Sequence, residues 1–354
     1  MDHARNDAEP ASGPARIPVT ILTGFLGAGK TSLLNRLLAD PGFADTAVIV
    51  NEFGAVGIDA ALVETAHERA FAQTAGCLCC TVSGDVRLTL LGLHEDAARG
   101  KGPTFGRLVI ETTGLADPAP VLHAIMSSDL VRERYALNGV VTLADAAAPR
   151  TLERFAEARR QVAVADLLLL SKTDLAPASD ELEGSLRALA PNARLLRAAD
   201  ATAGDIFARA ALDPALKPPE VAAWLRFDQG HAHAHDPDRH GSDITALCYE
   251  AAGALPAADV EDALDGLMDL LGRDLLRLKA VLTLDDDPGA PVVLHAVQHV
   301  LHPPGRLAAK PDGMPDNRLV VIAAGAGRGR VAETVTRILP ALRPVRDYAT
   351  ADAD

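Results

Sequence analysis

The chain has 354 residues, of which 48% are hydrophobic, so it is long enough for two domains that each bury a core. Its 34 Lys and Arg against 48 Asp and Glu give a formal net charge of −14, which argues against broad contact with nucleic acid or an anionic membrane. Polar residues at 1–15 and the lack of a long apolar run predict a cytoplasmic protein without a membrane-spanning segment.

The first half of the chain alternates short apolar runs with segments of helical pattern. The runs predict strands at 18–23, 46–50, 107–111, 138–144 and 166–171, and the helical patterns predict helices at 31–40, 83–100 and 149–163. Strands that are apolar on both faces and alternate with helices indicate an α/β fold, with a mostly parallel sheet flanked by helices.

The composition changes near residue 211, where Pro, Gly, Asp and His become frequent and apolar periodicity fades. Beyond this stretch the sequence predicts strands at 244–251, 275–284, 291–301 and 317–324, and helices near 257–271 and 328–342. Strands that follow one another directly favour antiparallel pairing, so this part is predicted to be a smaller α+β domain.

A phosphate-binding loop stands between the first predicted strand and the first predicted helix. The stretch GFLGAGKTS matches the pattern G-x-x-x-x-G-K-[ST], in which backbone N–H groups, the Lys and the Thr contact phosphates and Mg²⁺. The predicted nucleotide ligands are Gly24, Gly27, Ala28, Gly29, Lys30, Thr31 and Ser32, with Thr31 also a ligand of Mg²⁺. The alternative is a glycine-rich turn without a ligand, but such a turn does not require Lys-Thr.

Two later motifs complete the predicted nucleotide site. RLVIETTG ends a strand with Glu111, predicted to lie near Mg²⁺, and with Gly114, whose N–H would sense the γ phosphate. In LLLLSKTD, Lys172 can lie along a purine ring and Asp174 can accept from guanine N1–H and the exocyclic amine, which favours GTP over ATP. Read singly, these motifs could be a strand that happens to end in Glu and a solvated turn.

Three of the four cysteines fall within the tetrapeptide CLCC. In an extended segment Cys77 and Cys79 face one side, and a turn can bring Cys80 to them. Three clustered thiolates suit Zn²⁺ and also accommodate Co²⁺. The alternative is three small buried cysteines, and the remaining Cys248 is predicted to lie in the core.

A histidine-containing stretch precedes the second domain. Its histidines are His231, His233, His235 and His240. Neutral imidazoles on a flexible loop can gather a metal loosely, so we predict a recruiting role for this stretch, with a solvated linker as the alternative. His295 and His299 share a face of one predicted strand and are expected to have ordinary packing or surface roles.

The ordered set of motifs resembles the CobW-type metallochaperone GTPases, relatives of the nickel-inserting hydrogenase and urease accessory GTPases. The stretches that carry the likeness are GFLGAGKTSLLN, IVNEFGAVGID, GCLCC, LVIETTGLADPAPV, QVAVADLLLLSKTDL and LLRLKAVL. The resemblance spans residues 17–340 and implies a P-loop GTPase domain, a smaller C-terminal domain, and GTP-gated delivery of a divalent transition metal, usually zinc or cobalt.

The resemblance also implies roles for the segment NEFGAVGID. Glu52 corresponds to a family position near both Mg²⁺ and the transferable metal, and Asp59 ends the same switch-like loop. Ala55 stands where relatives often have Glu, so a carboxylate ligand is missing there. The expected catalytic residues are Lys30, Glu52, Asp59, Glu111 and Gly114, and the expected transition-metal ligands are Cys77, Cys79, Cys80 and Glu52.

The predicted organisation has five segments. They are a disordered N-terminus at 1–15, a GTPase domain at 16–212, a histidine-containing linker at 213–242, a CobW-like C-terminal domain at 243–345 and a tail at 346–354. The expected function is a GTP-hydrolysing metallochaperone that uses GTP/GDP, Mg²⁺ and Zn²⁺ or Co²⁺. Its expected partners are a client metalloprotein or metal-insertion complex and a second copy in a homodimer, but neither nucleic acid nor a membrane.

Two other functions remain as alternatives: a regulatory or scaffold GTPase with a fixed structural metal, and an ATP-dependent kinase or NTPase. The segment ETTGLADP predicts slow hydrolysis, because Leu115 stands where many regulatory GTPases have a Gln that orients the attacking water. Water positioning would then come from the backbone, from Glu52, Asp59 or another polar residue, or from a partner.

Overall fold

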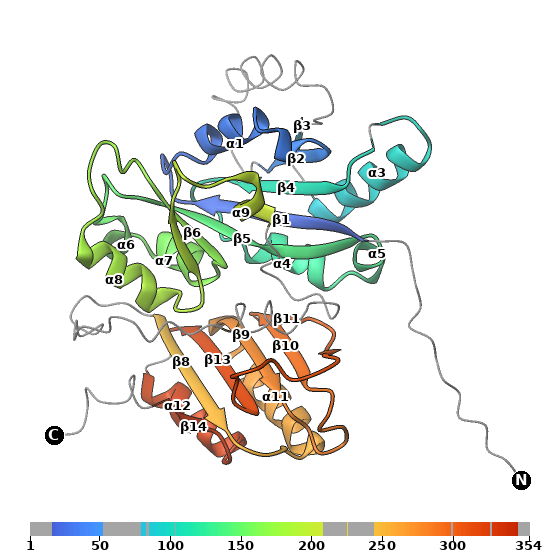
Figure 1. The fold of residues 1–354 in the computed structure, drawn as a ribbon, viewed down its shortest axis with the longest axis vertical. Coiled ribbons are helices and arrows are strands. Elements are labelled where there is room, and N and C mark those ends of the chain that lie inside the picture. The colour runs from blue at the N-terminus through green and yellow to red at the C-terminus, as the bar shows by residue number, and fades with distance from the viewer. Residues whose placement is uncertain are drawn as a thin grey trace, which may run out of the picture.

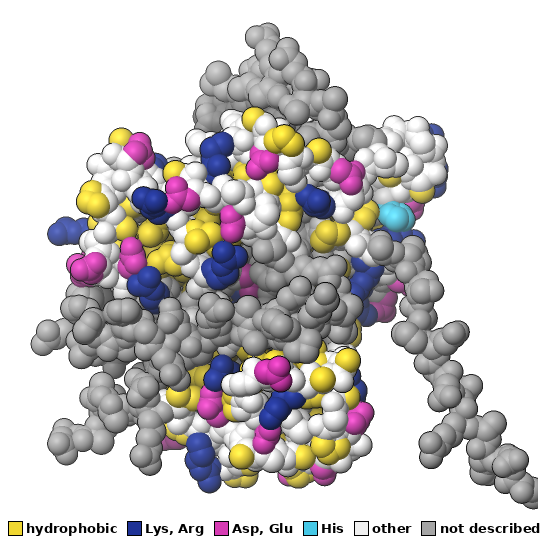
Figure 2. Space-filling view, viewed as in Figure 1, with side chains coloured by type: hydrophobic (Ala, Val, Ile, Leu, Met, Phe, Trp, Pro, Cys, Tyr) yellow, Lys and Arg dark blue, Asp and Glu magenta, His cyan; other side chains and the backbone are white. Residues whose placement is uncertain are grey.

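The computed structural model describes residues 16–51, 79–82, 85–102, 104–207, 225, 244–298, 300–325 and 328–345. Figure 1 shows an N-terminal domain, blue to green, and a C-terminal domain, orange to red. Figure 2 shows basic and acidic side chains interspersed over the described surface of both domains on the face in view. Within the described residues, no helix has both the length and the apolar character needed to cross a membrane.

A seven-stranded parallel sheet forms the centre of the N-terminal domain, with the order β3-β2-β4-β1-β5-β6-β7. The strands are β1 (Ile17–Gly24), β2 (Thr46–Asn51), β3 (Cys79–Val82), β4 (Arg107–Thr112), β5 (Tyr135–Asp145), β6 (Leu167–Ser171) and β7 (Arg194–Arg197). Because β1 lies between β4 and β5, the segment after β1 stands at the middle of the carboxyl edge of the sheet, where ligands bind in such folds.

Helices lie on both faces of this sheet. They are α1 (Lys30–Leu38), the 3-10 turn η1 (Pro41–Phe43), α3 (Val86–Ala98), α4 (Ala119–Met126), α5 (Asp129–Arg132), α6 (Thr151–Arg154), α7 (Ala156–Ala163), α8 (Asp180–Leu189) and α9 (Ala203–Phe207). In β4, Val109 joins the apolar core under α1, whereas Leu108 and Ile110 join the core under α3, α4 and α7. This two-sided burial explains why the strands read as continuous apolar runs.

The C-terminal domain is an antiparallel sheet with helices on one face. Its strands run in the order β11-β10-β9-β13-β8-β14, with β12 beside β10. The elements are β8 (Ile244–Ala251), α11 (Ala257–Leu271), the 3-10 turn η3 (Gly272–Asp274), β9 (Leu275–Leu282), β10 (Val292–Val297), β11 (Val300–Leu301), β12 (Gly305–Arg306), β13 (Asn317–Ala324), α12 (Arg328–Ile338) and β14 (Arg343–Pro344). The predicted fold class, an α/β domain followed by a smaller α+β domain, is confirmed.

Two predicted elements are each divided in the structure. The helix predicted at 149–163 is α6 and α7, because Phe155 between them is extended, with φ −128° and ψ 117°. Its ring packs on Phe25, with 4.5 Å between ring centroids. The strand predicted at 291–301 is β10 and β11, because Gln298 adopts φ 50°. A tertiary ring contact and a tight turn thus override patterns that are locally regular.

The two domains share one apolar core. Helices α4, α7 and α8 of the N-terminal domain contact β8, β9 and β10 of the C-terminal sheet. Val162 and Ala165 belong to the same cluster of buried side chains as Ile244, Cys248 and Ile322. Cys248 is 2% exposed, so its predicted place in the core is confirmed, and burial raises the pKa of its thiol to about 12. The C-terminal sheet is therefore covered on both faces.

Three charged side chains are buried in this interface. Asp166 Oδ1 accepts from Arg277 Nη2 at 2.7 Å and from Lys279 Nζ at 2.8 Å, and each side chain is at most 3% exposed. Burial alone would raise the pKa of the Asp166 carboxyl, but the two cations and their hydrogen bonds outweigh it and hold that pKa well below its usual range. Burial and the neighbouring Arg277 lower the pKa of Lys279 to about 8, although Asp166 opposes this shift.

The histidine predicted to have a packing role lies beside this charged cluster. His295 is buried in β10, and its burial, followed by the charges of Arg277 and Lys279, lowers the pKa of the imidazole well below its usual value. His295 is therefore neutral near pH 7. The other member of the predicted pair, His299, lies outside the described residues.

Candidate nucleotide site

The loop predicted to bind phosphate connects β1 to α1. Gly24, Gly27 and Gly29 have φ values of 144°, 72° and 92°, in the region that favours glycine. Helix α1 begins at Lys30, so its first N–H groups, which have no partner within the helix, stand at the end of this loop. Ala28 packs in the core beneath the loop, and Ser32 is exposed on α1. This arrangement is a cradle for an anion.

Beside the loop, a lysine, a hydroxyl and a carboxylate come together. Lys30 Nζ donates to the carbonyl oxygens of Gly24 at 2.7 Å and Phe25 at 3.3 Å. Burial lowers the pKa of Lys30, and Glu111 opposes that shift. Thr31 Oγ1 donates to Glu111 Oε1 at 3.1 Å. Hydroxyl and carboxylate oxygens are the ligands that Mg²⁺ prefers, so this pair fits a magnesium ion beside bound phosphates.

Gly114 lies directly against the phosphate loop. A Cβ atom at this position would approach the backbone nitrogen and Cα of Leu26 to 2.6 Å. Only glycine permits this contact between the segment after β4 and the loop after β1. The structure thus brings the predicted γ-phosphate sensor to the edge of the sheet that carries Lys30 and Glu111.

The residues predicted to recognise the base follow β6. Lys172 has φ 55°, and its Nζ lies 2.6 Å from Asp145 Oδ2 at the end of β5. Asp174 is exposed two residues further on. Strands β1 and β6 are separated by β5 alone, so their carboxyl ends lie about 10 Å apart. That interval lets one nucleotide contact the phosphate loop with its phosphates and the β6 loop with its base.

The predicted metal site is placed only in part. Cys79 and Cys80 are the first residues of β3, opposite Val48 and Ile49 of β2. The chain is extended at Cys80, where we expected a turn. The predicted site residues outside the described part of the chain are Glu52, Asp59, Cys77, His231, His233, His235 and His240.

Two residues that contact this site, Asp145 and Gln161, were not predicted from the sequence. Asp145 could have been found as an acid at the carboxyl end of a predicted strand. Gln161 gives no such signal, because it lies on a helix with ordinary amphipathic spacing. Its Nε2 donates to the carbonyl oxygens of Gly114 at 3.1 Å and Ala116 at 3.0 Å, although Gly114 is 47 residues earlier in the chain.

Comparison with known proteins identifies the family. Residues 18–197 match the CobW/HypB/UreG nucleotide-binding domain, and residues 244–339 match the cobalamin synthesis protein CobW C-terminal domain. The chain belongs to the CobW/HypB/UreG family. The family expected from the sequence motifs is therefore confirmed for both domains, and this CobW/HypB/UreG protein is of the GTP-binding P-loop class.

Several relatives of this CobW/HypB/UreG protein match over both domains. Zinc chaperone YjiA of Escherichia coli is 34% identical over 276 residues, which cover 77% of this chain and 83% of that protein. Zinc chaperone CobW of Pseudomonas aeruginosa is 32% identical over 333 residues, covering 82% and 83%. The crystal structure of Zn(II)-bound YjiA GTPase from E. coli matches with a TM-score of 0.67 and 27% identity, over 92% of this chain and 99% of that one.

Proposed function

We propose that this protein binds and hydrolyses GTP with Mg²⁺ and delivers a transition metal, zinc in the first place, to a client metalloprotein under nucleotide control. The observation that carries the proposal is that the likeness to two zinc chaperones extends over 83% of each of those proteins, beyond the nucleotide-binding domain. Cobalt is the second candidate metal, because a thiolate site also accommodates Co²⁺.

The geometry of the nucleotide site supports the role that we propose for each residue. The N–H groups of the phosphate loop hold the phosphates, and Lys30 exchanges its carbonyl partners for phosphate oxygens. Thr31 and Glu111 would hold Mg²⁺, which would neutralise charge on the phosphates. Gly114 contacts the γ phosphate, while Lys172 and Asp174 hold the guanine.

For the metal we propose a site made by Cys77, Cys79, Cys80 and Glu52. Strand β3, which carries two of these cysteines, pairs with β2, and β2 ends at Asn51, next to Glu52. β2 also pairs with β4, whose end carries Glu111. GTP would order the segments that follow β2 and β4 and close the metal site, and hydrolysis would release them. Residues 231–240 would recruit the metal but not transfer it.

Nucleotide-dependent metal affinity tests this proposal against a GTPase with a fixed structural metal. We expect the purified protein to bind Zn²⁺ more tightly with a non-hydrolysable GTP analogue than with GDP, by titration against a chelating indicator. A fixed metal predicts equal affinity in both states, and that result would contradict metal delivery while leaving GTP binding intact.

Replacing the three clustered cysteines with serine is expected to abolish tight metal binding. The triple change of Cys77, Cys79 and Cys80 removes the soft ligands, yet leaves the phosphate loop unchanged, so binding of Mg²⁺-nucleotide should survive. The matched control is Cys248→Ala, which removes the buried thiol outside the motif.

Deleting residues 231–240 should lower only the stoichiometry of metal binding or the rate of metal capture. If the deletion abolished the tightest metal site and the triple serine variant kept it, our assignment of the two sites would be reversed.

The Asp174→Asn variant is expected to lose its preference for guanine. The carboxylate accepts two N–H groups of guanine, and an amide cannot accept both, so GTP affinity should fall by at least about tenfold. Xanthosine triphosphate, which presents an acceptor where guanine has the amine, should bind the variant better than it binds the natural protein. Competition against a fluorescent GTP analogue gives both values. Equal affinity of the natural protein for ATP and GTP would refute the role of Asp174.

Hydrolysis by the isolated protein is expected to be slow, near the lower end of the range of about 10⁻⁴ to 10⁻² s⁻¹ for unstimulated GTPases. The side chain of Leu115 is apolar and 54% exposed, and it cannot orient an attacking water. Bound metal and client should accelerate the reaction. Single-turnover assays of apo, metal-loaded and client-bound protein measure this, and fast turnover by the apo protein would rule out hydrolysis as a timer for delivery.

A further inference from the structure

Gln161 on α7 holds the segment that carries Gly114. Its side chain is fully buried, and its Nε2 donates to the carbonyl oxygens of Gly114 at 3.1 Å and Ala116 at 3.0 Å. A glutamine amide has two N–H donors, and both are used on this one segment. The backbone of Gln161 is itself held, since Thr142 Oγ1 of β5 donates to its carbonyl oxygen at 2.8 Å.

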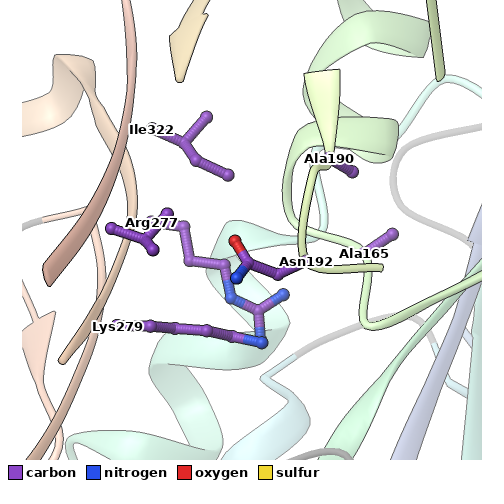
Figure 3. Close-up of a pocket in the computed structure, with 7 residues that line it drawn as sticks. Ala165, Ala190, Asn192, Arg277, Lys279 and Ile322 are labelled. Carbon is purple, nitrogen blue, oxygen red and sulfur yellow. The ribbon is translucent and has the colours of Figure 1, made fainter. Parts of the chain in front are cut away.

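The carboxyl end of α7, about one turn beyond Gln161, is bound by the C-terminal domain. Arg277 of β9 donates to the carbonyl oxygen of Val164, the residue that caps α7, and also to Asp166 at 2.7 Å. Unpaired carbonyls and the helix dipole favour a cation at this end of a helix. Figure 3 shows the side chains of Arg277 and Lys279 reaching from the C-terminal sheet toward Ala165 of the N-terminal domain.

These two attachments are one helical turn apart. Val164 is three positions after Gln161, which is about 4.5 Å along a helix axis. Val162 and Ala163 between them are buried in the core that the two domains share. A turn packed in this way moves as a rigid unit, so a displacement at Gln161 must reach Val164.

We propose that α7 couples the segment at residues 114–116 to the C-terminal domain through Gln161 and Arg277. The proposal rests on the proposed GTP function. A γ phosphate that attracts the Gly114 N–H would move the two carbonyls that Gln161 holds. Leaving the buried carbonyl of Gly114 and the part-buried carbonyl of Ala116 without their donor is costly, so α7 follows the segment and shifts the carbonyl that Arg277 binds.

Coupling of this kind is reciprocal. If nucleotide state changes the contact of Arg277 with α7, then weakening that contact must change the affinity for GTP relative to GDP. The structure supplies a pair of variants for comparison, because Arg277 and Lys279 both donate to Asp166, and Arg277 also donates to the carbonyl of Val164.

The test compares four variants by the ratio of their affinities for a non-hydrolysable GTP analogue and for GDP. Gln161→Met keeps the length of the side chain and removes both donors, and Arg277→Met removes the contact with α7. We expect each to change the ratio by about fivefold or more, within the usual range of coupling between sites. The controls Arg160→Met, on the exposed face of α7, and Lys279→Met should change it less than about twofold.

Hydrogen exchange in the natural protein gives an independent result. Amides of β9 should exchange at different rates with the GTP analogue and with GDP, and Gln161→Met should remove that difference. If Gln161→Met does not fold, the natural protein and Arg277→Met decide the question. The coupling would be overturned if both nucleotides bound and exchange in β9 were identical. It would also be overturned if the folded variants had unchanged affinity ratios. Either result would leave the GTP function in place. Failure of the natural protein to bind any guanine nucleotide would overturn the GTP function as well.

Discussion

The Asp166→Asn variant is expected to be less stable than the natural protein by about 3–5 kcal/mol. Asp166 is the carboxylate that compensates the buried charges of Arg277 and Lys279, both at most 3% exposed. Asparagine keeps the shape and one acceptor, yet leaves two cations in the interface with no opposing charge from this position. Urea unfolding followed by circular dichroism measures the difference.

An exposed pair of the same chemistry provides the control. Asp286 and Arg306 form an ion pair at 2.5 Å, with side chains 47% and 39% exposed, so Asp286→Asn should change the stability by less than about 1 kcal/mol. A similar small effect of Asp166→Asn would mean that the interface cluster contributes no more than a surface pair, and would contradict the importance that we assign to its burial.

The acid limb of the stability curve checks the same residue. The pKa of Asp166 is lower in the folded protein than in the unfolded chain, where it is about 3.9. The unfolded state therefore takes up a proton first as the pH falls. The stabilisation by Asp166 is complete above about pH 5 and decreases as the pH falls through 3.9 toward the folded pKa. Asp166→Asn lacks this group, so its stability should fall less steeply in that range.

The Lys30→Ala variant is expected to bind both GTP and GDP at least about 100-fold more weakly. Lys30 is 8% exposed at the start of α1, and its ammonium group would make charge-assisted hydrogen bonds with the β and γ phosphates, each worth about 1.5–3 kcal/mol. Two such bonds exceed the 2.7 kcal/mol that corresponds to 100-fold. Calorimetric titration with each nucleotide measures the loss.

Two comparisons make this result specific. Lys101→Ala removes an exposed lysine after α3 and should leave both affinities unchanged. Asp174→Asn should weaken guanine nucleotides selectively, whereas Lys30→Ala should weaken any purine nucleotide, because we propose that Asp174 binds the base and Lys30 the phosphates. A Lys30→Ala protein that binds GTP within about tenfold of the natural affinity would place the phosphates elsewhere.

The parts of the site that lie on short segments could be predicted from the sequence. Gly24 and Thr31 stand in one motif between a strand and a helix, and that motif also specifies a partner acid at the end of another strand. The contact of Thr31 with Glu111, 80 residues later in the chain, is what the two motifs together predict. The ion pair of Lys172 with Asp145 was not predicted, because no motif marks the acid.

The interface cluster could not be predicted for a different reason. In LLRLKAVL the alternation of Arg277 and Lys279 with apolar residues shows that both lie on one face of a strand. Alternation alone favours water on that face, since charged side chains are seldom buried. In the structure this face of β9 is covered by Asp166 and the end of α7. Asp166 is 111 residues before Arg277, and only the packing of the two domains brings them together.

The position of β3 affects the free energy needed to release a metal from its cysteines. Among the described strands it is joined to β2 alone, through four pairs of residues, and it is the outermost strand of the sheet. Peeling this rim strand away leaves the contacts of β2 with β4 and of β4 with β1 in place. Local openings of this kind need only part of the free energy of global unfolding. If Cys79 and Cys80 hold the metal, as we propose, opening of β3 would release it to another protein while the nucleotide-binding centre of the sheet stays folded.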